Sequence, residues 1–273
     1  MKKLLVILAV IIAAASTFAI DDQIKAAVEE QIGSGRIDWE NGIVIATGYG
    51  AYNLEDKNIG RGRLMALRAA ELDAKRNLLE TLEGVRISSE TIVKNFQTEN
   101  DVIYSRMDGF IKGARRYGEE RYNSDGTVEV DIAVPLFGEK GLFGLISPSF
   151  QFGDIAVPDI RDVAYTGLVV IVKDENAKPM MAPKIVNENG DVIYAAEFVN
   201  KDYAIKMGIV GYATDIEKAK KNDRVTDKPL VLNAVKVTGD NVVISNADAD
   251  KLGKLKDKLT FIQQCRVMFV LSY

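Results

Sequence analysis

The stretch GRGRLMALRAAELDAKRNLLETLEG, residues 60–84, is the strongest helical signal in the sequence and decides the expected fold. Its leucines recur mostly at steps of three and four residues, alanines fill the gaps, and charged residues fall largely on other faces. Gly84 is well placed to end the helix. We therefore expect one long helix that lays a stripe of leucines on a sheet. The leucines of this stripe are Leu64, Leu67, Leu72, Leu78, Leu79 and Leu82.

Strand signals lie on both sides of this helix. Residues 42–52 combine β-branched residues with bounding glycines, and 85–94 is again rich in β-branched residues. A short helix is expected over 100–110. Asp125-Gly126 separates two strand-like runs and predicts a hairpin, whose second strand alternates apolar and polar residues. Residues 20–137 thus predict an α+β domain of two layers.

The second half of the chain shows the same mixture of signals. Residues 167–172 read as a buried apolar strand, and Asn189-Gly190 predicts a second hairpin. An interrupted helical pattern covers 201–221, and the chain ends with a charged helix and a closing strand, over 248–258 and 265–271. Residues 163–273 therefore predict a second α+β domain. We expect a two-domain α+β protein, each domain a mostly antiparallel sheet with one or two packed helices.

Residues 138–162, rich in glycine and phenylalanine and without clear periodicity, are assigned to the inter-domain connection. Burying a phenylalanine is worth about 1.5–3 kcal/mol, so exposed phenylalanines here would be costly. We expect this segment to pack across both domains. The alternative is a contact surface for a partner or a lipid, with Phe143, Phe150 and Phe152 as its binding residues.

The first nineteen residues have the layout of a secretory signal peptide. Lys2 and Lys3 precede an unbroken apolar run over 4–15, and small residues occupy positions 17 and 19. The run is shorter than the roughly 20 apolar residues of a transmembrane helix. We expect cleavage after Ala19 and export to the periplasm or the cell surface; a retained N-terminal anchor is the alternative. Because the lone cysteine, Cys265, lies far from this segment, we do not expect a lipoprotein.

The composition of the chain argues against several kinds of partner and active site. The formal net charge is −4 without a clustered basic excess, which argues against a nucleic-acid partner. The chain contains no histidine, the usual general base and the commonest metal ligand. Ser-His-Asp, Cys-His and histidine–zinc chemistry are thereby excluded. We expect no catalytic residues, no cofactor and no metal site, with a carboxylate-dependent hydrolase as a minor alternative.

Gly60-Arg61-Gly62-Arg63 opens the long helix and has the clearest ligand chemistry. N–H groups at a helix N-terminus favour anions, and arginine binds carboxylates or phosphates in a bidentate manner. Arg61 and Arg63 are therefore candidate contacts for a cell-wall carboxylate or a lipid phosphate. The alternative is that both arginines are solvated and pair with nearby acids, namely Glu55, Asp56 or Glu71.

Residues 61–136 contain an alanine-rich helix, a glycine turn, Ile111 to Gly113, Asp125-Gly126-Thr127 and a valine-rich strand in that order. This pattern resembles the Lpp-twenty lipoprotein family and the similar N-terminal domain of flagellar assembly protein T. The resemblance implies an exported envelope protein, often outer-membrane associated and sometimes linked to flagella or surface assembly, without catalytic residues. Family lipoproteins carry an acylated cysteine after the signal peptide, and this chain has none there.

The second half resembles a domain found beside that unit in uncharacterised exported bacterial proteins, which implies no activity. The segments that carry this resemblance are 165–168, 182–185, 202–205, 211–213 and 244–248.

Together these observations predict a non-enzymatic structural or assembly component of the cell envelope. It would act through contacts with envelope or surface-assembly proteins, with the cell wall or lipid as further contacts. The alternative is a periplasmic carrier of an anionic or lipidic ligand, bound at residues 60–63 or at the phenylalanine segment. A contact surface predicts an exposed apolar patch, and a carrier predicts an apolar pocket of about 300–1,000 Å³. A hydrolase predicts converging carboxylates.

Overall fold

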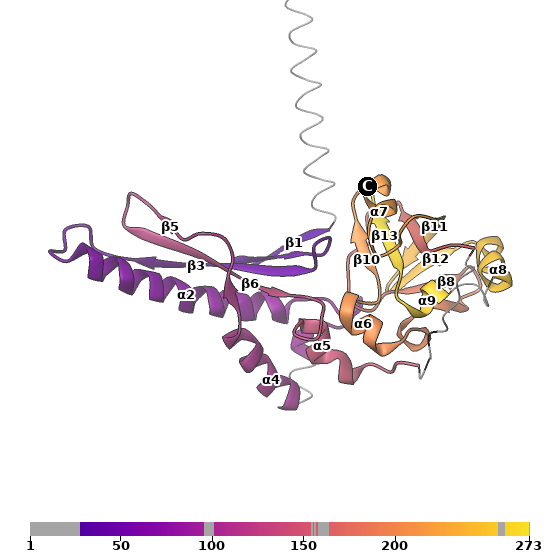
Figure 1. The fold of residues 1–273 in the computed structure, drawn as a ribbon, viewed down its shortest axis with the longest axis horizontal. Helices are drawn as coiled ribbons and strands as arrows, with labels where there is room; N and C mark the ends of the chain where they lie inside the picture. Colours follow the sequence, from indigo (N-terminus) through magenta and orange to yellow (C-terminus); the bar gives the residue numbers. More distant parts are fainter. Residues whose placement is uncertain are drawn as a thin grey trace, which may run out of the picture.

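The computed structural model describes residues 28–95, 101–153, 155, 157, 164–255 and 260–272, and the expected signal peptide lies outside them. Two separate sheets carry the packed helices, one in each half of the chain (Figure 1). The protein is therefore an α+β protein of two domains, as the sequence predicts. Within the described ranges, no helix is both long and apolar enough to cross a membrane.

The first domain lays one long helix along an antiparallel sheet of order β1-β2-β3-β6-β4, in which β5 also pairs with β6 (Figure 1). The strands are β1 (Glu29–Ile32), β2 (Gly35–Asp38), β3 (Ile43–Ala51), β4 (Arg115–Arg116), β5 (Arg121–Tyr122) and β6 (Thr127–Pro135). The helices are α2 (Ile59–Glu83), α4 (Asp101–Lys112), α5 (Leu142–Ile146) and the 3-10 turn η1 (Ser147–Ser149). The predicted hairpin at Asp125-Gly126 joins β5 to β6 and is confirmed.

Helix α2 contacts the sheet mainly through alanines. Its buried side chains are Ala66, Ala70, Ala74, Leu78, Thr81 and Leu82. The reason lies in Gly48 and Gly50 of β3, because a Cβ atom at Gly48 would lie only 2.0 Å from the backbone N of Ala74. Strand and helix are therefore in backbone contact beside Gly48 and Gly50, and leucines do not fit between them there. Further along the helix, Leu78 and Leu82 are buried as predicted. Leu64 and Leu72 are 51% and 68% exposed, so the predicted leucine stripe is wrong at these positions.

The second domain is built on a mixed sheet of order β10-β13-β7-β11-β12-β8-β9. Its strands are β7 (Gly167–Val172), β8 (Lys184–Asn187), β9 (Val192–Tyr194), β10 (Gly211–Ala213), β11 (Pro229–Thr238), β12 (Asn241–Ile244) and β13 (Val267–Leu271). Its helices are η2 (Ala196–Phe198, a 3-10 turn), α6 (Lys201–Met207), α7 (Ile216–Lys220), α8 (Asn246–Lys254) and α9 (Thr260–Gln263). Most described strand pairs in this sheet are parallel, so the expectation of a mostly antiparallel second sheet is wrong.

The middle of this sheet is buried on both faces. Leu168 and Val170 of β7 belong to the main hydrophobic core, whereas Val169 between them belongs to a smaller cluster that includes Ala219 of α7. Strands covered on both sides are typical of parallel sheets and carry continuous apolar runs. The run at 167–172 therefore correctly predicts a buried strand, and it also carried the signal for parallel pairing.

Two further segments differ from the structure that the sequence predicts for them, and a third agrees with its prediction. Residues 201–221 contain α6, strand β10 and α7 in turn rather than an interrupted helix. Residues 85–94 form no regular strand, and only an isolated bridge joins Arg86 to Ile92. The hairpin predicted at Asn189-Gly190 joins β8 to β9 and is confirmed.

One hydrophobic core continues through both domains. Trp39, directly after β2, packs edge-on against Tyr212 of β10 with ring centroids 5.8 Å apart. The Tyr212 hydroxyl accepts a hydrogen bond from the Met180 N–H and donates one to the Met180 carbonyl. Arg86 forms a bidentate ion pair with Glu30 at 2.5 and 2.7 Å and also donates to a backbone carbonyl of the second domain. Packing and polar contacts thus join the two domains.

Candidate functional site

The phenylalanine segment is packed inside the protein. Phe143 of α5 is fully buried, with its ring centroid 5.3 Å from that of Phe150 and 6.4 Å from that of Phe152. Phe150 and Phe152 are partly buried against the same core. Helix α5 contacts α4 of the first domain and α6 of the second. The prediction that this segment packs across both domains is confirmed, and Phe143 is not a surface contact for a partner.

The start of this segment crosses between the domains. A Cβ atom at Gly42 would lie 2.9 Å from the Phe137 ring, and the same ring also occupies the space beside Gly208 of the second domain. Gly138 donates its backbone N–H to the Ile205 carbonyl at 2.7 Å. The beginning of the connection therefore belongs to the domain junction and is not a loose linker.

Arg63 lies in the first turns of α2, at the end of the first domain that is distant from the second (Figure 1). Its Nε donates to the Tyr52 hydroxyl at 3.1 Å. Its guanidinium lies over the rings of Tyr52 and Tyr122, 5.6 and 5.7 Å from their centroids. These cation–π contacts take the place of the expected ion pairs with acids. Glu71, one of the expected acids, pairs with Arg116 instead.

Arg61 does not share a site with Arg63. Its backbone N–H donates to the side chain of Asn58, which caps the helix, and its side chain is exposed. Residues two apart on a helix project about 200° apart, because each residue turns the helix by about 100°. The two arginines therefore do not converge on one anion.

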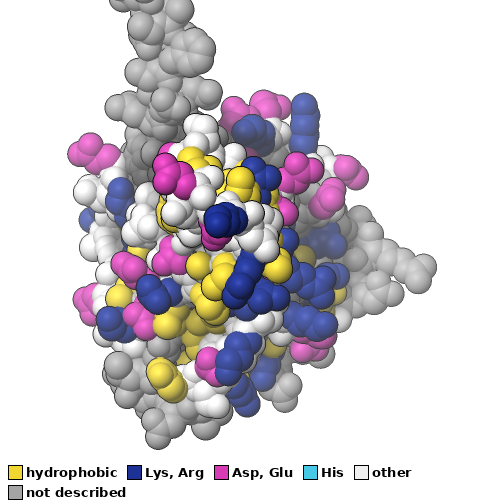
Figure 2. Space-filling model, turned by 90° about the vertical axis from the view of Figure 1, so that its left-hand side faces the viewer, with side chains coloured by type: hydrophobic (Ala, Val, Ile, Leu, Met, Phe, Trp, Pro, Cys, Tyr) yellow, Lys and Arg dark blue, Asp and Glu magenta, His cyan; other side chains and the backbone are white. Residues whose placement is uncertain are grey.

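The outward face of α2 carries an apolar and cationic seam that the sequence analysis missed. Met65 and Leu72 are 59% and 68% exposed, and Leu79 continues their seven-residue spacing while partly buried. Cations alternate with these three residues at steps of three and four, which is the spacing of a coiled-coil seam. We name this set the outer seam: Arg61, Met65, Arg68, Leu72, Lys75 and Leu79. Figure 2 looks onto the end of the first domain that is distant from the second domain, and there hydrophobic side chains lie beside a group of Lys and Arg side chains.

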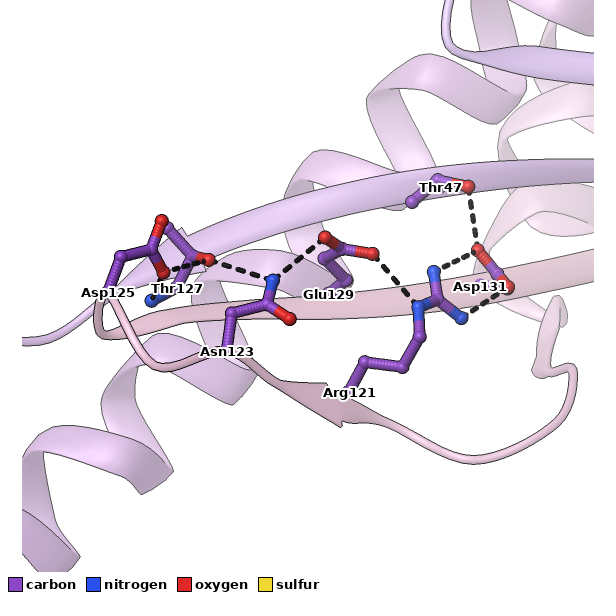
Figure 3. Close-up of polar contacts among 7 residues, drawn as sticks. All are labelled: Thr47, Arg121, Asn123, Asp125, Thr127, Glu129 and Asp131. Atoms are coloured by element: carbon purple, nitrogen blue, oxygen red, sulfur yellow. Dashed lines mark hydrogen bonds and ion pairs between the residues drawn. The ribbon is translucent and has the colours of Figure 1, made fainter.

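The opposite face of the first sheet carries a polar network (Figure 3). Arg121 of β5 donates to Glu129 at 2.9 Å and to Asp131 at 2.8 Å, both on β6. Asp131 also accepts from the Thr47 hydroxyl of β3 at 2.6 Å, and Asn123 donates to Glu129 at 2.9 Å. Hydrogen bonds from Arg121 are the main reason why the pKa values of Asp131 and Glu129 are lowered. The network fastens the β5–β6 hairpin to the sheet and keeps both carboxylates ionised.

The single thiol is shielded. Cys265 is fully buried just before β13, and burial raises its pKa to about 12. Its backbone carbonyl accepts a hydrogen bond from Arg224 at 2.8 Å. A thiol with such a pKa stays protonated and is a poor nucleophile. In the part of the chain that the structure describes, no group of three or more acidic or cysteine side chains is arranged to hold a metal ion.

Comparison with known proteins finds a likeness in the second domain. The family model described as Treponema pallidum Tp0624, second domain, matches residues 167–273, from β7 to the end of the chain. The comparison with curated proteins finds no match. The matched part is less than half of the chain, so it does not assign the whole protein to a family. The resemblance of residues 61–136 to the Lpp-twenty family stays a prediction, because the match begins after them.

Proposed function

We propose that this protein is a non-enzymatic component of the bacterial cell envelope, and that it binds another envelope protein through the outer seam of α2. The observation that carries the proposal is the exposure of Met65 and Leu72 on a helix whose opposite face is tightly packed. Full burial of one such side chain is worth about 1.5–3 kcal/mol. A partner that covers both therefore has a substantial driving force.

Charge complementarity indicates the chemistry of this partner. Arg61, Arg68 and Lys75 form no ion pair with another described residue, whereas Arg76 beside them pairs with Asp73. An amphipathic helix with apolar residues at coiled-coil spacing and acidic residues between them would complement both the apolar and the cationic residues of the outer seam. The proposed partner is thus an envelope protein that presents an acidic amphipathic helix.

The carboxylates of the polar network support a binding role over hydrolysis. A hydrolase with two carboxylates needs one of them protonated near neutral pH, with a raised pKa. Glu129 and Asp131 both accept hydrogen bonds from Arg121, which lowers the pKa of both carboxylates. Neither is suited to act as a general acid.

Export to the periplasm or the cell surface is supported by the layout of residues 1–19, and association with the outer membrane or a flagellum by the resemblance of residues 61–136. Cell fractionation and N-terminal sequencing test this part. We expect a mature chain that begins at Ile20 in the envelope fraction. A full-length chain in the cytosol would contradict it.

Site-specific photo-crosslinking in intact cells tests the contact itself. A photoreactive residue at Leu72 should form an adduct with one envelope protein. The same residue at Val235, 54% exposed in the second domain, is the matched control and should not form that adduct. The double variant Arg61→Glu, Arg68→Glu should abolish the Leu72 adduct, whereas Lys236→Glu should preserve it. Equal adducts at both positions, or none at Leu72, would refute the proposal.

The carrier alternative gains no support at the two places where the sequence put it. Arg61 and Arg63 project from different sides of α2, and Phe143 lies in the core.

A further inference from the structure

A groove lies between α4, α5 and the end of β6. Its volume is about 750 Å³, within the size range of small-molecule sites. Every residue that lines it is described: Arg106, Gly109, Phe110, Gly113, Arg115, Ala133, Val134, Pro135, Glu139, Lys140, Gly141, Gly144 and Leu145. It is distinct from the outer seam of α2 and from the polar network.

The groove offers an apolar surface that is open to a ligand. Phe110 and Leu145 line it while remaining partly buried against the core. Gly109 of α4 adds space, because a Cβ atom at this position would have no other atom within 4 Å. A hydrocarbon chain placed here would bury apolar surface at about 25 cal/mol per Å².

Three cations surround this surface. Arg106 comes from α4, Arg115 from β4 and Lys140 from the segment before α5, against the single acid Glu139. None of the three cations forms an ion pair with another described residue. The neighbouring cations Lys112 and Arg116, by contrast, do form ion pairs.

Lys112 pairs with Asp108 at 2.6 Å, and Arg116 pairs with Glu71 and Glu120. Unpaired cations around a concave surface create a field that attracts an anion. The cations that face the groove are thus the ones left available to a ligand.

We propose that this groove binds an anionic single-chain amphiphile. The carboxylate or phosphate head group would pair with Arg106, Arg115 and Lys140, and the hydrocarbon chain would pack on Phe110 and Leu145. This site is independent of the proposed protein contact, because the outer seam lies on α2 and shares no residue with the groove.

Isothermal titration calorimetry with the mature protein tests the site. The probes are dodecyl phosphate and dodecanoate below their micellar concentrations, with neutral dodecyl maltoside and inorganic phosphate as comparisons. We expect one molecule of an anionic amphiphile to bind per protein. The probe that binds more tightly, dodecyl phosphate or dodecanoate, identifies the head group. Tighter or equal binding of the maltoside, or of inorganic phosphate alone, would overturn the proposal.

Variants separate the groove from nonspecific binding. The double variant Arg106→Gln, Arg115→Gln should weaken binding by about tenfold or more, since it removes two charge-assisted contacts. The double variant Arg61→Gln, Arg68→Gln removes the same charge elsewhere and should leave affinity unchanged. Loss of binding in both double variants to the same degree would contradict a site at the groove.

Gly109→Leu is the decisive variant, because it fills the groove from a helix position where the backbone is not strained. Leucine has a higher helix propensity than glycine, so the melting temperature should hold or rise. Binding should be lost while the fold is retained. Unchanged affinity in Gly109→Leu would refute the proposal.

Discussion

Replacing Gly48 with alanine tests the closest contact in the first domain. The new Cβ atom would lie 2.0 Å from the backbone N of Ala74 and 2.2 Å from the backbone O of Ala70, whereas ordinary contacts begin at 3.4 Å. Strand and helix must therefore separate by about 1.4 Å, because no side-chain rotation relieves a clash between backbone atoms. This separation loosens the whole alanine face of α2.

The expected cost follows from this geometry. Overpacking of a core costs about 1–3 kcal/mol, and a clash with backbone on both sides places this variant at the upper end. The gain from a less flexible unfolded chain offsets about 0.4–1 kcal/mol. We expect a net loss of about 2–2.6 kcal/mol, which for a chain of this size lowers the melting temperature by about 4–10 °C.

Chemical and thermal unfolding, followed by circular dichroism, measure this loss. Gly60→Ala is the matched control, because the nearest atom to its Cβ would be 3.9 Å away. It should leave the free energy of unfolding unchanged or raise it by up to about 1 kcal/mol, because alanine is the better helix former and makes the unfolded chain less flexible. If Gly48→Ala proved as stable as Gly60→Ala, the inferred backbone contact between β3 and α2 would be wrong.

Three further outcomes are expected. Phe143→Ala should lower the free energy of unfolding by about 3–5 kcal/mol, and Phe152→Ala by less, in denaturant titrations; equal small losses would contradict the packing of the segment. Asp131→Asn should destabilise the protein at pH 7, and the difference from wild type should fade as the pH falls below the ordinary aspartate pKa of about 3.9, because the folded-state pKa is lowered. A difference that persists undiminished at pH 2 would show that charge is not its cause. Native Cys265 should react with iodoacetamide at pH 8 far more slowly than the unfolded chain, and equal rates by mass spectrometry would contradict its burial.

Local signals in the sequence predicted the elements well, whereas contacts between distant segments escaped them. Asp125-Gly126 and Asn189-Gly190 each specify a turn within a few residues, so both hairpins were predictable. The face of α2 was not, because spacing alone cannot show that Gly48 draws the helix backbone onto the strand.

The candidate sites show the same contrast between local sequence patterns, which are visible in the sequence, and tertiary contacts, which are not. The seven-residue spacing of Met65, Leu72 and Leu79 is visible in the sequence, but Leu72 and Leu79 are assigned there to the buried stripe and Met65 to no site. The stacking of Arg63 on Tyr122 depends on a tertiary contact between residues 59 positions apart, for which no local pattern exists. The parallel pairing of the second sheet was in part readable, since continuous apolar strands such as β7 favour it.

Because the two domains share one hydrophobic core, we expect them to move as one stiff unit. Helix α2, with 25 residues at about 1.5 Å each, is an arm about 37 Å long. Tension applied near Leu72 would reach the far half through the rings of Trp39 and Tyr212 and through the hydrogen bond from Arg86 to the Pro179 carbonyl, and would bypass the covalent connection. A protein held on the arm would thereby keep a set spacing and orientation relative to anything held by the other half.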